Sequence, residues 1–503
     1  MEIQAEKQSA VGEVSQDAMS EFDALLKKEF SPKTPKAQAA ISSAVQTLAE
    51  QALAKTLTIS DDVMQTIQSM IADIDKKLAE QINLIIHHEE YQKLESAWRG
   101  LHYLVNNTET DETLKIKYIN ISKDDLKKNL KKYRGTAWDQ SPIFRQIYEE
   151  EFGKLGGAPF GALVGDYYFN HEAPDVAMLA DIAQIAAASH APFLTAASPT
   201  IMQMGSWEEL SNPRDLTKIF QSEEYASWRS LRESEDSKYL GLTMPRFLAR
   251  LPYGAKTNPV EGFAFEEETA STDTENSHDK YAWANSAYAM ATNINRSFKE
   301  YGWCSRIRGI ESGGAVQNLP VHSFKTSDGS MDMKCPTETG ISDRRELELA
   351  NNGFMPLLHK KNSDFAAFIG AQSLHKPTEY ADPDATANAN LAARLPYLFA
   401  TCRFAHYLKV MAREKVGSFS SSESLQGWLQ DWILQYVDGD PENSTEATKA
   451  RKPLAHAEVV VEEVEGNPGF YTSKFYLRPH YQLEGMTVSL RLVSKLPSQK
   501  AGG

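Results

Sequence analysis

Several stretches of the sequence carry residue types that could do chemistry, and their spacing tests each possibility. The glycine-rich run GKLGGAPFGALVGD, at 153–166, suggests a phosphate-binding loop. However, Lys154 does not stand at the end of a GxxxxGK[ST] motif, and no GxGxxG opens a helix here. No GxSxG stretch indicates a hydrolase nucleophile either. We therefore interpret these glycines as backbone turns.

Two stretches contain possible metal ligands. The motif HHEEY places His87 and His88 beside two glutamates in a helical stretch, but the HExxH spacing of a zinc site is missing. Adjacent residues of a helix also project in different directions. Asp438 and Asp440 lie in VDGDPEN, which lacks the twelve-residue calcium pattern and is better explained as a turn. We expect no metal ion and no cofactor.

The cysteines are far apart, odd in number and outside any CxxC pair: Cys304, Cys335 and Cys402. This usage argues against a disulfide framework and favours a reducing compartment. No sequence motif pairs one of them with a histidine, so we expect buried structural thiols.

One segment is rich in arginine. The stretch WRSLRESEDSKYLGLTMPRFLARLPYG contains Arg229, Arg232, Arg246 and Arg250. These side chains could form an anion-binding pocket. Ion pairs on helix surfaces and arginines packed at an internal interface explain the pattern more simply. Since no catalytic constellation assembles along the chain, we expect a protein that is not an enzyme, although distant residues could still build an active site.

The composition of the chain further limits the class of protein to which it can belong. Among 503 residues, 41% are hydrophobic and 24% are charged, which is typical of a folded protein. The net charge of -15 argues against broad nucleic-acid binding, because a phosphate backbone repels such a surface. The N-terminus lacks the apolar core of a signal peptide, and no apolar run reaches the ~18 residues of a membrane span. We expect a cytoplasmic protein that does not insert into membranes.

The predicted secondary structure changes along the chain from helical to mixed helix and strand. Residues 1–36 combine a polar N-terminus with a short amphipathic helix, whose apolar face holds Phe22, Leu25 and Leu26. This helix is too short to be stable alone, so it docks either on its own protein or in a partner's groove. The next region, 37–107, reads as a helical hairpin.

After residue 107 the pattern becomes mixed α/β. Region 108–384 includes strand candidates at 114–121, 305–310, 354–360 and 365–374, and a βαβ unit over 160–198. Region 385–503 predicts a long helix kinked at Pro396, a second helix over 424–437, a polar loop at 438–453, and a β-hairpin over 457–478. The last strand alternates Met486, Val488, Leu490 and Leu492 with polar residues, so one of its faces is buried and its edges need partners.

Many long blocks of the sequence resemble one family. They include NPRDLTKIF, PRFLARLPYG, ISDRRELELANNGF, LAARLPYLFATCRFAHYLK and YLRPHYQLEGMTVSLRLVSKLP. In this order, over about residues 20–497, they resemble the large subunit of the type VI secretion contractile sheath, the TssC/VipB/EvpB/ImpC family. The resemblance implies a multi-domain, mixed α/β sheath subunit with an N-terminal helical region and a C-terminal helix-plus-sheet domain.

The same resemblance implies partners. The chain would form an obligate pair with the small sheath subunit TssB, and the pairs would stack as a six-start helical sheath around an Hcp inner tube on a baseplate. Contraction would drive the tube and its effectors into a target cell, after which the ATPase ClpV would disassemble the sheath. Such a sheath acts in the bacterial cytoplasm.

The family's interaction residues carry over by position and pattern. Strand exchange between protomers would involve Phe475 and Leu477 together with the alternating apolar residues at 486–492. The helix holding Phe22, Leu25 and Leu26 matches the ClpV-binding element in place and amphipathic type. Two alternatives stay open at this point: a single-chain phage-type tail sheath, which would assemble without a small subunit, and a cytoplasmic enzyme whose arginines bind an anion.

Overall fold

The computed structural model describes residues 63–212, 215–269, 278–325, 330–415, 422–463 and 471–480. The chain divides into two compact units, one of residues 1–84 with 260–265 and one of residues 85–259 with 266–503. The first contains most of helix α3 (Val63–Ile86). Everything described below belongs to the second unit.

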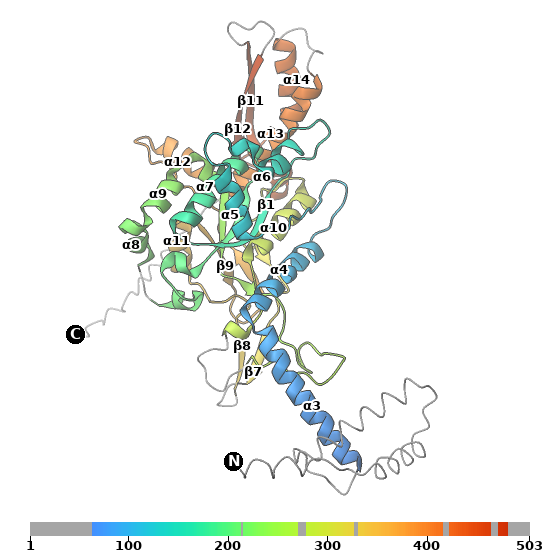
Figure 1. Cartoon of the computed structure of the whole chain (residues 1–503). Helices are drawn as coiled ribbons and strands as arrows, with labels where there is room; N and C mark the ends of the chain where they lie inside the picture. Colours follow the sequence, from blue (N-terminus) through green and yellow to red (C-terminus); the bar gives the residue numbers. More distant parts are fainter. Residues whose placement is uncertain are drawn as a thin grey trace, which may run out of the picture. The chain divides into compact units, whose positions relative to one another are not determined.

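A six-stranded sheet forms the centre of the second unit (Figure 1). Its order is β1 (Leu163–Phe169), β2 (Phe193–Ala197), β3 (Leu240–Met244), β9 (Phe354–His359), β10 (Ala366–Phe368) and β6 (Ala315–Val316). The first four strands are parallel, whereas β10 runs antiparallel to both of its neighbours. Helix α7 (Ala173–Ser189) connects β1 to β2, so the predicted βαβ unit is confirmed.

Helices cover both faces of this sheet. Successive strand residues point to opposite sides, so neighbouring residues of one strand join different cores. On β2, Phe193 belongs to a core that includes Leu179 of α7 and the buried Trp228, which follows β2 later in the chain. Its neighbour Leu194 belongs to a second core with Met290 of α10 (Ser286–Tyr301). The chain thus forms the expected mixed α/β architecture around two cores.

Shorter elements surround these layers. The helices are α4 (Glu89–Asn106), α5 (Lys123–Lys132), α6 (Pro142–Phe144), α8 (Leu216–Gln221), α9 (Ala226–Glu233), α11 (Asp343–Asn351) and α12 (Pro383–Ala392). Two small sheets pair β4 (Phe247–Leu248) with β5 (Trp283–Ala284), and β7 (His322–Lys325) with β8 (Met331–Lys334). The hydroxyl of Ser122 accepts a hydrogen bond from the Asp125 backbone N–H at 3.1 Å, which caps α5.

A third core lies in the C-terminal region. It joins α13 (Leu395–Lys415) and α14 (Ser422–Leu434) to the antiparallel hairpin of β11 (Leu454–Glu463) and β12 (Tyr471–Pro479). Figure 1 shows α14 running beside this hairpin. The predicted helix and hairpin are both confirmed, and the hairpin begins at Leu454, three residues earlier than expected.

Four local expectations are wrong. Residues 114–121 and 305–310 contain no strand. The helix expected to bend at Pro396 is two helices, with that proline in the first turn of α13, where its missing N–H costs no hydrogen bond. The polar stretch at 438–453 contains helix α15 (Glu446–Arg451), which the Thr445 hydroxyl caps by accepting from the Thr448 N–H at 3.3 Å.

Within the helical region expected over 37–107, residues 87 and 88 separate α3 from α4. His88 is the N-cap of α4, and its Nδ1 accepts a hydrogen bond from the Glu90 N–H at 3.3 Å. In the part of the chain that the structure describes, no helix is both long and apolar enough to cross a membrane.

Candidate functional site

The arginine-rich segment forms internal contacts. The Arg250 guanidinium donates to Glu95 Oε1 at 2.6 Å and to Glu267 Oε2 at 2.5 Å, and all three side chains are almost fully buried. Burial raises the pKa of Glu95, but Arg250 and Arg99 outweigh it and lower that pKa. Burial likewise raises the pKa of Glu267, but His87 and Arg250 outweigh it and lower that pKa. This network fastens α4 to the loop after β4.

The other arginines of the segment also find partners inside the chain. Arg232 donates to the carbonyl oxygens of Leu374 and Asn351, each at 3.0 Å. Arg229 donates to two backbone carbonyls, and Arg246 pairs with the buried Glu338 at 2.5 Å. These contacts confirm the simpler prediction of arginines packed at an internal interface.

The possible metal ligands are likewise engaged. His87 lies 3.5 Å from Glu267, and the Asp438 carboxylate accepts hydrogen bonds from the Ser444 hydroxyl at 2.9 Å and the Asp440 N–H at 3.2 Å. Within the described residues no group of three or more histidine, cysteine, aspartate or glutamate side chains could hold a metal ion.

The C-terminal hairpin of β11 and β12 packs on helices by one of its two faces. Ala457, Val459 and Val461 of β11 are buried in the third core. Opposite them, in direct register, Leu477 and Phe475 of β12 are partly buried against the same core, facing α13 and α14. Phe475 and Leu477, which the resemblance assigns to strand exchange, thus lie on the inward face of β12, and their role in strand exchange stays a prediction.

Glutamine side chains close the outer edge of β11. Gln430 of α14 accepts a hydrogen bond from the Val459 N–H at 2.8 Å and donates to the Ala457 carbonyl at 3.1 Å. Gln426 accepts from the Val461 N–H at 3.1 Å. These amides satisfy the backbone groups that a further strand would need, so this edge is blocked.

The edge of β12 is different. Since the backbone groups of Val459 and Val461 point away from β12, those of their partners Phe475 and Ser473 point away from β11. Among the described residues, β11 is the one strand that pairs with β12. In the described part of the sheet, strand addition is therefore possible only along β12.

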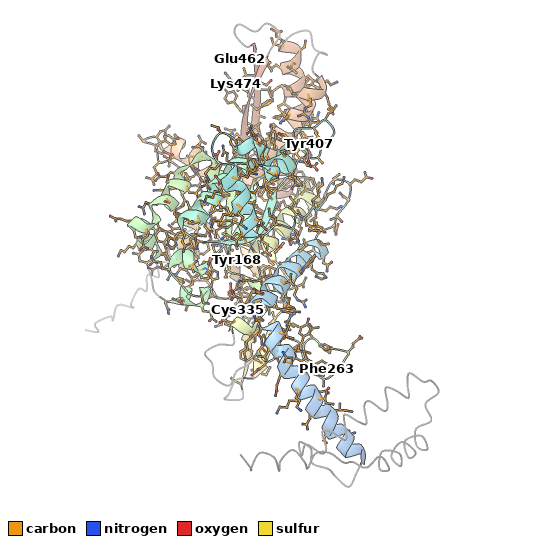
Figure 2. The ribbon with its side chains drawn as sticks, viewed as in Figure 1. Tyr168, Phe263, Cys335, Tyr407, Glu462 and Lys474 are labelled. Atoms are coloured by element: carbon orange, nitrogen blue, oxygen red, sulfur yellow. The ribbon has the colours of Figure 1, made fainter. Side chains whose placement is uncertain are left out.

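An apolar hollow of about 260 Å³ lies beside that edge. Its lining comes from α13, α14 and β12: Ala405, Leu408, Lys409, Ala412, Leu429, Ser473 and Phe475. A strand added to β12 would place alternate side chains over α13, and this hollow has the size and polarity to take an aliphatic one. At the far end of the hairpin, Lys474 and Glu462 form a cross-strand ion pair at 2.6 Å (Figure 2).

The end of β12 is held in place where the chain leaves the sheet. The His480 backbone N–H donates to the Pro453 carbonyl at 3.1 Å, and its imidazole Nε2 lies 2.8 Å from the Lys452 carbonyl. Both contacts hold the end of β12 against residues 452 and 453.

Two groups of predicted residues lie outside the described residues: Met486, Val488, Leu490 and Leu492 of the last strand, and Phe22, Leu25 and Leu26 of the N-terminal helix. Their roles stay predictions. Conversely, Gln426 and Gln430 were missed. Their one signal in the sequence is the spacing of four residues, which places two amides on one face of α14.

Comparison with known proteins identifies the family. Residues 68–375 match the family model described as EvpB/VC_A0108, tail sheath N-terminal domain, and residues 384–496 match the EvpB/VC_A0108 tail sheath gpW/gp25-like domain. The type VI secretion system sheath protein TssC1 of Pseudomonas aeruginosa (strain PAO1) is 71% identical over 491 residues, which cover 98% of each chain.

The matches among solved structures are more distant. One is a chain of the anti-feeding prophage baseplate, with a TM-score of 0.36, 9% identity and coverage of 76% of this chain and 84% of that one. Another is the contracted sheath of that prophage, with a TM-score of 0.28, 12% identity and coverage of 64% and 75%. The assignment rests on the sequence matches alone: the chain belongs to the EvpB/VC_A0108 tail sheath family, that of the type VI secretion sheath large subunits.

Proposed function

We propose that the chain is the large structural subunit of a contractile sheath in the bacterial cytoplasm. It pairs with the small subunit TssB, and the pairs form a six-start helical tube around the Hcp inner tube and on a baseplate. The observation that carries this proposal is the 71% identity to the sheath protein TssC1 over nearly the whole of both chains. The work of such a subunit is mechanical, since its energy is stored in the lattice contacts that contraction rearranges.

The domain division that we propose follows this task. Residues 1–36 bind a partner, 37–107 form a helical region, 108–384 make the sheath body, and 385–503 form the domain that links protomers. A linking domain needs an element that can pair with another chain, and the β12 edge has this property in the second unit.

Strand exchange through this domain is the proposed linkage between protomers. The exposed backbone groups of β12 and the apolar hollow beside Phe475 support it. Backbone hydrogen bonds hold the register between two chains while the bodies rotate during contraction. We assign Phe475 and Leu477 to this shared sheet, together with Met486, Val488, Leu490 and Leu492 of the final strand.

Co-expression with TssB followed by electron microscopy tests the proposal. The unmodified pair should form tubes. The double substitution Val488→Asp with Leu490→Asp should abolish tubes and leave a soluble pair, because charged side chains cannot enter the buried face of the shared sheet.

The matched control is Thr487→Asp with Ser489→Asp, which adds the same charge to the polar positions of the strand and should leave the tubes intact. Normal tubes from the Val488/Leu490 variant would contradict strand exchange at these residues. Tubes formed without TssB would instead indicate a single-chain sheath.

A further inference from the structure

Helix α13 contacts the end of α7 through a buried histidine. His406 of α13 is 2% exposed, and its imidazole Nε2 lies 2.9 Å from the backbone carbonyl oxygen of Ser189, the last residue of α7. The ring also meets Phe152 edge-on, with 5.0 Å between the two ring centroids. One imidazole thus connects α13 both to α7 and to the segment that precedes β1.

The two nitrogens of this imidazole are in different situations. A carbonyl oxygen only accepts hydrogen bonds, so Nε2 carries the proton and donates to Ser189. Nδ1 of His406 is buried and has no hydrogen-bond partner within the described residues. A proton added to Nδ1 would create a charge and an unpaired N–H in a buried site, and both cost free energy there.

The charged groups around His406 oppose this proton further. Arg403 and Lys409 lie on α13 itself, and His190 directly follows α7, with 6.2 Å between its ring centroid and that of His406. The Lys409 ammonium lies 3.6 Å from the centroid of the Phe152 ring. In the described part of the chain, no carboxylate forms an ion pair with His406.

The carboxylates nearest to Phe152 in the sequence are engaged elsewhere. Glu149 pairs with Arg145 at 3.3 Å, and Glu151 pairs with Lys117. The groups that face the imidazole from three sides are therefore cationic, neutral or apolar, and none of them would stabilise a second proton on the ring.

The pKa of the imidazole agrees with this geometry. Burial is the largest cause that lowers the pKa of His406, and Arg403, His190 and Lys409 lower it further, while the bond to the Ser189 carbonyl raises it. The balance brings this pKa to about 4, so the ring is neutral at pH 7. In an opened state the pKa would return to about 6.5. Since the folded value is the lower one, the contact has its full stability above about pH 6.5 and loses it as the pH falls toward 4.

We propose that the contact between His406 and Ser189 is an acid-sensitive connection, which releases α13 from α7 when the imidazole takes up a proton. At neutral pH the ring donates to Ser189 and packs on Phe152. The protonated ring leaves this site for water, which solvates its charge, and α13 separates from α7. Ala405 and Leu408 of α13 also line the hollow beside β12, so this separation changes that surface too. The proposal does not depend on sheath assembly.

Hydrogen–deuterium exchange of the full-length chain at pH 7.5 and pH 5 tests the proposal, after correction for the intrinsic pH dependence of amide exchange. The equilibrium constant for opening of α13 should rise about 30-fold between these pH values, as pKa values of about 6.5 and 4 require. A peptide that covers β9, in the central sheet, provides the reference. If the α13 peptide changes no more than the β9 peptide, the proposal is overturned.

The substitution His406→Gln keeps a donor for the Ser189 carbonyl but cannot take up a proton. Most of the rise in α13 should therefore disappear, and the remainder belongs to His190. The matched control is His456→Gln, at an exposed position of β11, which should keep the rise of about 30-fold. An undiminished rise in the His406 variant overturns the role of this residue.

If His406→Gln prevents folding, the unmodified chain decides. Exchange of the carbon-bound hydrogen between the two imidazole nitrogens, followed by mass spectrometry, measures the pKa of each histidine separately. A midpoint for His406 below about pH 5.5 supports the proposal, whereas a midpoint at or above that value, toward the ordinary 6.5, overturns it.

Discussion

At the scale of single residues, the buried carboxylate of Glu338 shows what the arginines of this chain do. It is 4% exposed, and it accepts from the Arg246 side chain at 2.5 Å and from the Arg246 backbone N–H at 2.8 Å. His278 Nε2 lies 3.3 Å from the same carboxylate. Burial opposes the charge on Glu338, but Arg246 and His278 outweigh it and lower its pKa to about 2. The group is therefore held as an anion that ties the segment after β3 to the segment after β8.

Replacing Glu338 by glutamine should lower the free energy of unfolding by about 3 kcal/mol at pH 7, because Arg246 loses its carboxylate in a buried site. Since the folded pKa is below the unfolded value of about 4.3, the ionised form stabilises the fold above that pH. This stabilisation is lost as the pH falls toward 2, so the difference between the two proteins should shrink from pH 5 downward. Urea unfolding followed by tryptophan fluorescence at pH 7 and pH 3 measures both effects.

The control for this prediction is Glu235→Gln. Glu235 pairs with Lys238 through a side chain that is 76% exposed, and exposed pairs contribute less than about 1 kcal/mol. A similar loss of stability in both variants would mean that the buried position of Glu338 does not matter.

At the scale of elements, the hairpin of β11 and β12 has one closed edge and one open edge. Packing of α14 on β11 brings Gln426 and Gln430 to the first edge, where their amides take the place of a neighbouring strand. This asymmetry limits strand addition to one side of the hairpin.

The substitution Gln430→Leu should therefore loosen this edge. The Val459 N–H and the Ala457 carbonyl lose their side-chain partner, which should lower the free energy of unfolding by about 1–2 kcal/mol. Hydrogen–deuterium exchange at the Val459 amide should accelerate, and aggregation through β11 should increase. The exposed Gln435, just after α14, provides the control substitution Gln435→Leu. Unchanged exchange at Val459 would show that the glutamine does not protect the edge.

Elements defined by local pattern could be predicted from the sequence. The βαβ unit and the C-terminal hairpin depend on local hydrophobic periodicity and turn residues. The candidate strand at 114–121 has the same kind of pattern and yet forms no ladder, because pairing depends on a distant partner strand that the pattern does not reveal. The glutamine caps were missed for a related reason: Gln430 and Val459 are 29 residues apart and meet only through tertiary packing.

At the scale of the whole molecule, the proposed function requires that ClpV disassembles the sheath only after contraction. An extended lattice and a contracted one present different surfaces, and a disassembling ATPase that binds an element hidden in one state and exposed in the other acts on the correct state. We propose that this element is the helix predicted from the N-terminal sequence, which places Phe22, Leu25 and Leu26 on one face. Such a helix suits the groove of a partner, which would bury its apolar side chains.

The double substitution Leu25→Asp with Leu26→Asp tests this assignment. Contracted sheaths should still form with TssB, because the helix is not assigned to lattice contacts, whereas ClpV should no longer be retained in a pull-down with them. The control, Gln16→Asp with Ser20→Asp, adds the same charge upstream of the apolar face and should bind ClpV normally. If ClpV binds the Leu25/Leu26 variant as well as the unmodified sheath, its recognition element lies elsewhere in the chain. Loss of the tubes themselves would instead assign the helix to the lattice.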